Sequence, residues 1–266
     1  MLDLKKVCRE IEKAAHLAGD FIQKESVGFD ISRTEKKGLH DFVSYVDKES
    51  EKLLVEKLGI ILPEAGFLAE EGTSKKVGLI YNWVIDPLDG TTNFLHGLHP
   101  YCISIALKKN EEIIAGVVHE VSGNETFTAW KNGGAWLNGS AIHVSKASVL
   151  SDSLIATGFP YSDFSRLNSY MDCFTHFCKT THGVRRFGSA AIDLAYLACG
   201  RFEAFYEYGL HPWDIAAGIL LVTEAGGRVS DFSGNDKNLT GEEFLASNTL
   251  IFPEILEIVN KFMKNK

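Results

Sequence analysis

Residues 83–94 read Trp-Val-Ile-Asp-Pro-Leu-Asp-Gly-Thr-Thr-Asn-Phe, and this stretch is the most informative part of the sequence. An apolar run ends in two carboxylates, Asp86 and Asp89, which a proline and a leucine separate. The Gly-Thr-Thr that follows suits the start of a helix, where backbone N–H groups have no partner within the helix. The stretch therefore offers ligands for a metal ion and N–H groups for an anion within six residues. Metal-dependent chemistry on a phosphate group requires this pairing.

Two further acidic positions stand at the ends of apolar segments. Glu70 closes the short run Phe-Leu-Ala and precedes a second glutamate and a glycine. Asp214 occurs in His-Pro-Trp-Asp-Ile-Ala-Ala, where Pro212 suits the first turn of a helix and an acid is favoured near its N-terminus. If these two acids converge with Asp86 and Asp89, two Mg²⁺ ions balance the four charges, and a phosphate dianion favours a third ion.

Each acidic motif also has an ordinary structural interpretation. Asp-Pro-Leu-Asp-Gly is compatible with a turn that Asp86 opens through its side chain. Glu70 and Glu71 by themselves are typical of a solvated acidic pair, and Asp214 by itself is typical of a helix start. The joint occurrence of the motifs therefore favours a metal site more strongly than any one motif does.

The composition is that of an ordinary globular protein. Hydrophobic residues make up 45% and charged residues 23% of the 266 residues, which is enough for a large core. The formal net charge of −8 repels nucleic-acid phosphates, so we expect no direct nucleic-acid binding through the general surface. An anionic substrate remains compatible with this charge, because bound cations invert the local field.

The cysteines and the apolar runs bear on location. The five cysteines are scattered and form no Cys-x-x-Cys, which argues against a disulfide framework and a structural zinc site and favours a reducing cytoplasm. The opening Met-Leu-Asp-Leu-Lys-Lys does not resemble a signal peptide, and no apolar stretch reaches 18 residues. We therefore expect a cytoplasmic protein that does not enter a membrane.

Periodic apolar residues predict the elements of the first half of the chain. Steps of three and four residues between Leu4 and Phe21 predict an amphipathic helix. A second helix is predicted over about 45–58, with Ser44 and Asp47 spaced as in a capping box. Polar residues predict a loop over 25–40. Strands are predicted at 67–70, 81–85, 103–108, 113–121 and 125–130.

The second half alternates between helix and strand patterns. Strands are predicted at 154–157, 183–187, 202–208 and near 228 and 244. Helices are predicted at 163–180, 189–199, 212–225 and from Pro253 onward. This order resembles a layered αβαβ arrangement, and it places the fold in the mixed α/β (α+β) class. A weak boundary near residue 150 predicts two closely packed subdomains, about 1–150 and 151–266, within one compact unit.

The acidic motifs and their flanks resemble the signatures of the inositol monophosphatase family, of the bacterial inositol-1-monophosphatase type. Residues 83–94 are similar to the first signature, and residues 213–217 with 223–227 are similar to the second. Glu70-Glu71-Gly72 is similar to the acidic turn of the family. The resemblance runs from about residue 14 to residue 247. The Thr-Thr-Asn-Phe ending is typical of inositol monophosphatases, whereas the related 3′-phosphoadenosine phosphatases more often have Lys-Glu-Phe after the first threonine.

The resemblance implies a fold, an activity and a set of metal ligands. The fold would be a layered αβαβα sandwich, usually dimeric, with magnesium-dependent and lithium-sensitive phosphomonoesterase activity. Glu70, Asp86 and the backbone carbonyl of Leu88 would hold a first Mg²⁺ ion. Asp86, Asp89 and Asp214 would hold a second ion, and Glu70 would help to hold a third through water molecules.

The resemblance also implies roles around the reacting water and the substrate. Asp47 and Thr91 match the pair that orients the attacking water, with Glu70 assisting. Asp41 matches an acid near the third ion, and residues 36–37 fall in a mobile-loop region. The backbone N–H groups of Gly90 and Thr91 would cradle the phosphate, where a missing Cβ allows close approach. The sugar ring would contact Asp89, Gly188, Ser189, Ala190 and Glu207.

The expected reaction is direct hydrolysis of myo-inositol monophosphate to inositol and phosphate, without a covalent enzyme intermediate. The pocket rim decides the substrate and is not readable from the sequence, so two enzymatic alternatives stay open. One is a fructose-1,6-bisphosphatase with inositol monophosphatase activity, and the other is a phosphatase for a nucleotide or another sugar phosphate. An alternative of another class is a regulatory protein that binds a partner and keeps the phosphatase scaffold.

Overall fold

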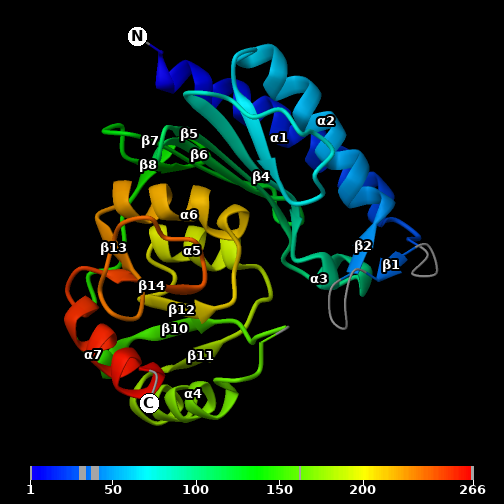
Figure 1. Ribbon diagram of the computed structural model, residues 1–266. Coiled ribbons are helices and arrows are strands. Elements are labelled where there is room, and N and C mark those ends of the chain that lie inside the picture. The colour runs from blue at the N-terminus through cyan, green and yellow to red at the C-terminus, as the bar shows by residue number, and fades with distance from the viewer. Residues whose placement is uncertain (1, 30–33, 37–41, 162, 265–266) are drawn as a thin grey trace.

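The computed structural model describes residues 2–29, 34–36, 42–161 and 163–264. Among the positions singled out in the sequence, Asp41 and Lys37 fall outside these residues. Figure 1 shows alternating layers of helices and sheets, from α1 and α2 at one side to α4 and α7 at the other.

The first layer consists of α1 (Leu4–Ser26) and α2 (Tyr45–Ile61). Both predicted helices are confirmed, and the apolar stripe of α1 is buried against the adjoining sheet. The predicted capping box of α2 is also confirmed: the hydroxyl of Ser44 accepts the N–H of Val46, and the Asp47 carboxyl accepts the N–H of Ser44 at 2.8 Å. These bonds satisfy donors at the helix start that would otherwise be unpaired.

A seven-stranded sheet forms the second layer, in the order β3-β4-β5-β6-β7-β8-β9. Strands β3 and β4 are parallel, and all other neighbours are antiparallel. The predicted meander is confirmed in β5 to β7. The strands are β3 (Gly66–Ala69), β4 (Tyr81–Asp89), β5 (Cys102–Lys109), β6 (Glu112–Glu120), β7 (Glu125–Trp130), β8 (Ala135–Leu137) and β9 (Ser140–Ile142).

Strands β8 and β9 were not predicted as strands, although the turn between them has a clear signal. Asn138 and Gly139 both have positive φ angles, 48° and 79°, as a tight two-residue hairpin turn requires. Each strand contains only three residues, so alternation between apolar and polar positions has no length in which to appear.

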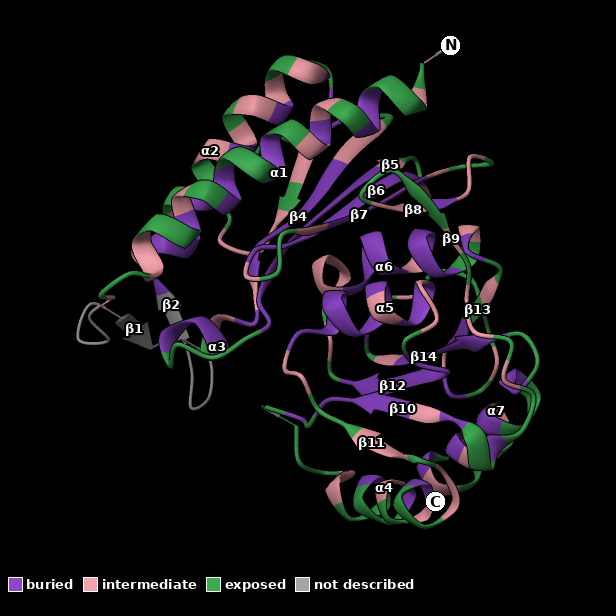
Figure 2. Cartoon of the chain, turned by 180° about the vertical axis from the view of Figure 1, so that it is seen from behind, coloured by how far each residue is buried: buried purple, intermediate pink, exposed green. Residues whose placement is uncertain are grey.

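The third layer consists of α5 (Ala190–Ala198) and α6 (Pro212–Glu224), which lie between the two sheets (Figure 1). One apolar cluster joins these helices to both sheets, with Val84 and Phe127 on one side and Phe205 on the other. Figure 2 shows the middle helices mostly in the colour of buried residues. The small side chains of these helices, alanines above all, allow close packing on two faces.

A five-stranded sheet and two outer helices complete the stack. The sheet order is β11-β10-β12-β14-β13, with β10 parallel to both β11 and β12. An apolar cluster that includes Tyr170, Tyr206 and Ile255 packs the outer helices on the sheet. The strands are β10 (Leu154–Thr157), β11 (Gly183–Arg185), β12 (Ala204–Tyr208), β13 (Gly227–Ser230) and β14 (Glu243–Asn248), and the helices are α4 (Leu167–Thr180) and α7 (Phe252–Met263).

The layers confirm the predicted αβαβα sandwich. Helix α4 begins later than predicted because the side chain of Asp163 accepts the N–H of Ser165, which forms a turn in place of the first helical turn. Part of the predicted 25–40 loop is a strand, β1 (Thr34–Lys36), which pairs with β2 (Phe42–Ser44). Within the described residues, no helix is long and apolar enough to cross a membrane.

Candidate active site

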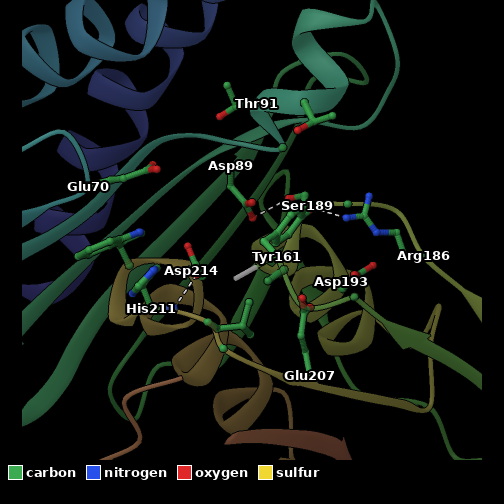
Figure 3. A pocket seen from close by; sticks show the side chains of 18 of the residues that line it. Glu70, Asp89, Thr91, Tyr161, Arg186, Ser189, Asp193, Glu207, His211 and Asp214 are labelled. Carbon is green, nitrogen blue, oxygen red and sulfur yellow. Dashed lines mark hydrogen bonds between the residues drawn. The ribbon is translucent and has the colours of Figure 1, made fainter. Parts of the chain in front are cut away.

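A cavity of about 400 Å³ lies where the end of β4 meets the beginnings of α3 (Thr91–Leu95), α5 and α6. Figure 3 shows the side chains around it. Glu70 and Asp214 line it, whereas Asp47, Asp86 and Leu88 are buried and stand outside the lining. All positions predicted to contact substrate line this cavity: Asp89, Gly90, Thr91, Gly188, Ser189, Ala190 and Glu207.

A bulge in β4 places its two aspartates, which are three residues apart, on the same face of the sheet. Residues three apart on a regular strand face opposite sides. Here Asp86 pairs with Ser104 and Asp89 pairs with Cys102, so a step of three on β4 matches a step of two on β5. This irregularity is a β-bulge at Pro87 and Leu88, and proline, which lacks an N–H group, is tolerated in a bulge. The bulge therefore turns Asp89 toward the side that Asp86 faces.

Asp86 opens a turn, as the ordinary structural interpretation of its motif predicts, and it also belongs to the acidic cluster. The N–H of Leu88 donates to Asp86 Oδ1 at 3.0 Å, as in an Asx turn. Burial, and then the carboxylates of Glu70, Asp89 and Asp214, raise the pKa of Asp86 well above its usual range. The four acids are thus close enough to repel one another, and Asp86 is 2% exposed.

Asp89 is fixed to the beginning of α5. Its Oδ2 accepts the hydroxyl of Ser189 at 2.7 Å and the N–H of Ala191 at 2.8 Å. Burial raises the pKa of Asp89 to about 6, although these bonds, the N–H of Gly90 and the charge of Arg186 lower it. The Ser189 hydroxyl also accepts the N–H of Ile192 and caps α5. A strand of the first sheet and a helix of the middle layer are therefore joined at the cavity.

Asp214 is held by the N-terminus of α6. Its Oδ2 accepts the N–H of His211 at 2.7 Å, and Pro212 occupies the first helical turn, as the sequence indicated. The ring of His211 stacks on Trp213 with 4.8 Å between centroids, which fixes the wall beside the acid. Burial and the nearby Asp89 raise the pKa of Asp214 well above its usual range.

Glu70 follows β3, and its N–H donates to the carbonyl of Ile85 at 3.2 Å. The turn after it is held by Glu51, whose carboxylate accepts the N–H of Glu71 at 2.6 Å and of Thr73 at 2.7 Å. Glu51 is fully buried in α2. Its two charge-assisted bonds fix the backbone that presents Glu70 to the cavity.

Thr91 and Asp47 are in contact, as the family resemblance implied. The Thr91 hydroxyl lies 3.1 Å from Asp47 Oδ1 and 2.8 Å from the carbonyl oxygen of Leu88. Burial raises the pKa of Asp47, while its bonds to Ser44 and Thr91 oppose this rise. Gly90, which precedes α3, has a φ of 89°, and a Cβ there would approach the Pro100 carbonyl oxygen to 3.1 Å. The positive φ angle and this close contact both favour glycine at this position.

The four acids lie near one another, but their side chains do not surround a single position for a metal ion. Among the described residues, no three side chains of His, Cys, Asp or Glu are spaced to hold one ion in the positions shown. The oxygen donors present are those that Mg²⁺ prefers, and the lining includes a single arginine and no lysine among the described residues. The chemistry of the site therefore fits a divalent cation.

Sequence reasoning missed two buried acids near the cavity, Glu51 and Asp193. The signal for Glu51 was its place on the buried stripe of α2, four residues after Asp47 and three before Leu54. The signal for Asp193 was an acid within the apolar, alanine-rich run of α5, between Ile192 and Leu194. Charged residues seldom occur in such stripes unless they are paired or functional.

Similarity to known proteins agrees with this geometry. A model of the inositol monophosphatase family matches residues 3–264. A putative Nus factor SuhB of Neisseria meningitidis serogroup B is 42% identical over 249 residues, which cover 93% of this chain and 95% of that protein. An inositol-1-monophosphatase of Rhizobium meliloti is 38% identical over 251 residues, which cover 94% and 92%. The crystal structure of extragenic suppressor protein suhB from Bartonella henselae aligns with a TM-score of 0.90 and 36% identity, covering 96% of this chain and 99% of that chain. Because these matches span both acidic signatures and all layers of the fold, the chain belongs to the inositol monophosphatase family.

Proposed function

We propose that the protein is a Mg²⁺-dependent phosphomonoesterase that hydrolyses myo-inositol monophosphate to inositol and phosphate. The observation that carries the proposal is the cluster of Glu70, Asp86, Asp89 and Asp214 beside the N-termini of three helices. The acids favour divalent cations, and helix N-termini favour an anion. A site that attracts both suits a metal-bound phosphate ester.

The metal ligands in this proposal are the carboxylates of Glu70, Asp86, Asp89 and Asp214 and the carbonyl of Leu88, for two to three ions. When bound, Mg²⁺ would stabilise charge on the phosphate and lower the pKa of a bound water. In this proposal the phosphate would lie beside the amides of Gly90 and Thr91, which line the cavity at the beginning of α3.

The protein groups that act on the attacking water would be Thr91, Asp47 and Glu70. The hydroxyl of Thr91 can donate its one proton to Asp47 Oδ1 or to the Leu88 carbonyl oxygen, both within 3.1 Å. Because these contacts fix the hydroxyl, its lone pairs and those of Asp47 would accept hydrogen bonds from a water molecule in a fixed direction. A covalent route through Ser189 is disfavoured, because its hydroxyl donates to Asp89 and no histidine is hydrogen-bonded to it among the described residues. Direct hydrolysis therefore fits best.

Phosphate release with Mg²⁺ tests the proposal. We expect the highest kcat/KM for myo-inositol 1-phosphate in a panel with fructose 1,6-bisphosphate and 3′-phosphoadenosine 5′-phosphate. Replacing Asp86 by asparagine should lower turnover by more than about a hundredfold, because a charged ligand is lost. Asp172→Asn, on the exposed side of α4, is the matched control and should keep full activity. Near-normal turnover of Asp86→Asn at saturating Mg²⁺ would refute the ligand assignment.

The second candidate is a regulatory protein that binds a partner, and the similarity to a putative Nus factor favours it specifically. All four acids of the cluster are present in this chain, so a partner-binding role would be added to the proposed chemistry. Absence of phosphate release across the whole panel, from a protein that melts cooperatively, would favour partner binding alone.

A homodimer, lithium sensitivity and the division into subdomains near residue 150 are further parts of the proposal. Light scattering measures the first and an activity curve with lithium measures the second. Expression of residues 1–150 alone, followed by circular dichroism, tests whether the first subdomain folds independently.

A further inference from the structure

The cavity has a second acidic end, formed by Asp193 and Glu207. Asp193 lies in the first turn of α5, and Glu207 lies in β12 of the other sheet. Both line the cavity, although they are only 1% and 5% exposed. Figure 3 shows them across the cavity from Glu70, on the side away from the first acidic signature. If the phosphate binds beside the proposed metal ligands, this end faces the part of the substrate beyond the phosphate.

The carboxyl group of Asp193 has one oxygen that the described residues leave unpaired. Its buried Oδ1 has no hydrogen-bond partner among the described residues, and none donates to the carboxyl of Glu207 either. A buried carboxyl without a partner is unfavourable in the folded protein. At the wall of a cavity, however, a ligand that carries hydrogen-bond donors can satisfy it.

Two glycines leave room for this arrangement. A Cβ at Gly158 would lie 1.9 Å from Glu207 Oε1, and a Cβ at Gly188 would lie 2.6 Å from Arg186 Nη1. The guanidinium of Arg186 donates to the Tyr161 hydroxyl and lies over the Tyr161 ring, 5.6 Å from its centroid. Arg186 is thereby held at the exposed rim, and no ion pair joins it to either acid among the described residues.

We propose that Asp193 is a specificity-determining residue, which together with Glu207 binds hydroxyl groups of an uncharged polyol that carries the phosphate. The proposal rests on the proposed phosphatase function. Carboxyl oxygens accept hydrogen bonds from neighbouring hydroxyls, whereas a second phosphate group at this end would meet two acids. Burial, and then the carboxylates of Glu207 and Asp89, also raise the pKa of Asp193 well above its usual range.

The test compares two esters that differ in hydroxyl groups, myo-inositol 1-phosphate and 4-nitrophenyl phosphate. We expect Asp193→Leu, which keeps the side-chain size, to lower the ratio of their kcat/KM values about tenfold, chiefly through KM for the inositol ester. Asp193→Asn keeps an acceptor oxygen at the same place and should lower this ratio less than about threefold. Asp193→Ala serves as a second loss-of-acceptor variant if the leucine variant does not fold.

The outcomes separate this inference from the proposed function. If the wild-type enzyme releases phosphate from neither ester, the proposed function fails. If it hydrolyses both and the Asp193 variants lose activity equally on both, Asp193 has a structural role and the inference alone is overturned. An unchanged ratio in Asp193→Leu overturns it as well. Melting curves with Mg²⁺ for each variant confirm that the compared proteins are folded.

Discussion

The buried histidine between α1 and the first sheet should make the stability of the protein depend on pH. The ring of His119 is 4% exposed and stacks on His16, with 4.5 Å between centroids. Both rings contact the hydroxyl of Thr126, at 3.0 Å from His119 Nδ1 and 2.9 Å from His16 Nε2. Burial, and then the neighbouring His16, lower the pKa of His119 from 6.5 to about 4, although Asp20 opposes the change.

The sign and size of the effect follow from these two values. Between pH 4 and 6.5 the unfolded chain binds a proton that the folded chain does not, so stability is complete above pH 6.5 and falls as pH falls. One pKa unit corresponds to about 1.4 kcal/mol, so the full shift is worth about 3 kcal/mol. About 2 kcal/mol of this is lost between about pH 7.5 and pH 5.

Urea unfolding at these two pH values measures the loss, and His119→Asn isolates it. The asparagine removes the titrating ring, so the free energy of unfolding of the variant should fall by about 2 kcal/mol less than that of the wild type. His182→Asn, at an exposed position, is the matched control and should behave as the wild type does. If the wild type and His119→Asn lose stability equally over this range, the buried neutral histidine is the wrong explanation.

Three further perturbations address the candidate site. Glu51→Gln should lower stability by about 1–3 kcal/mol in urea unfolding, because one of the N–H donors of Glu71 and Thr73 loses its acceptor; an unchanged midpoint would contradict this. Gly90→Ala should cost about 1–2 kcal/mol, since its φ of 89° is unfavourable for alanine, and should reduce phosphate release; a fully active and equally stable variant would show that this backbone geometry is not needed. Mg²⁺ with phosphate should raise the melting temperature of metal-free protein, by about 2.7 kcal/mol of stabilisation when the ligands reach about 100 times their Kd; a constant melting temperature at millimolar concentrations argues against the site.

Local patterns predicted most of the helices and strands because these elements are regular, whereas the complete αβαβα sandwich was implied by the family resemblance. The stripe from Leu4 to Phe21 predicted α1, and Ser44 with Asp47 predicted the start of α2, which is a bond between neighbours in sequence. Strands β8 and β9 were not predicted, because three residues are too few to show the alternation of apolar and polar positions that is typical of a strand. Only their turn, at Asn138 and Gly139, has a sequence signal.

The acids that belong to short sequence motifs could be predicted from the sequence. The roles of the other site residues depend on how distant segments pack together. Asp86, Asp89 and Asp214 stand in recognisable sequence contexts, and the structure brings them close together, with Asp89 and Asp214 in the cavity lining and Asp86 buried outside it. The roles of Glu51 and Asp193 arise only from contacts between distant segments, such as α2 with the turn after β3. The bulge in β4 could not be predicted either, because the pairing of β4 with β5 creates it and the sequence of a single strand does not reveal that pairing.

The bulge has a consequence for the kinds of mutation that this segment tolerates. Asp89 shares the face of Asp86 at a step of three residues only because the bulge absorbs one of them. Removing one residue between the two aspartates would leave a step of two on both strands, so Asp89 would still face the side of Ser189 and α5. The bulge, and with it the turn in which the N–H of Leu88 donates to Asp86, would be lost. The extra residue therefore serves this local turn, and the side that Asp89 faces does not depend on it.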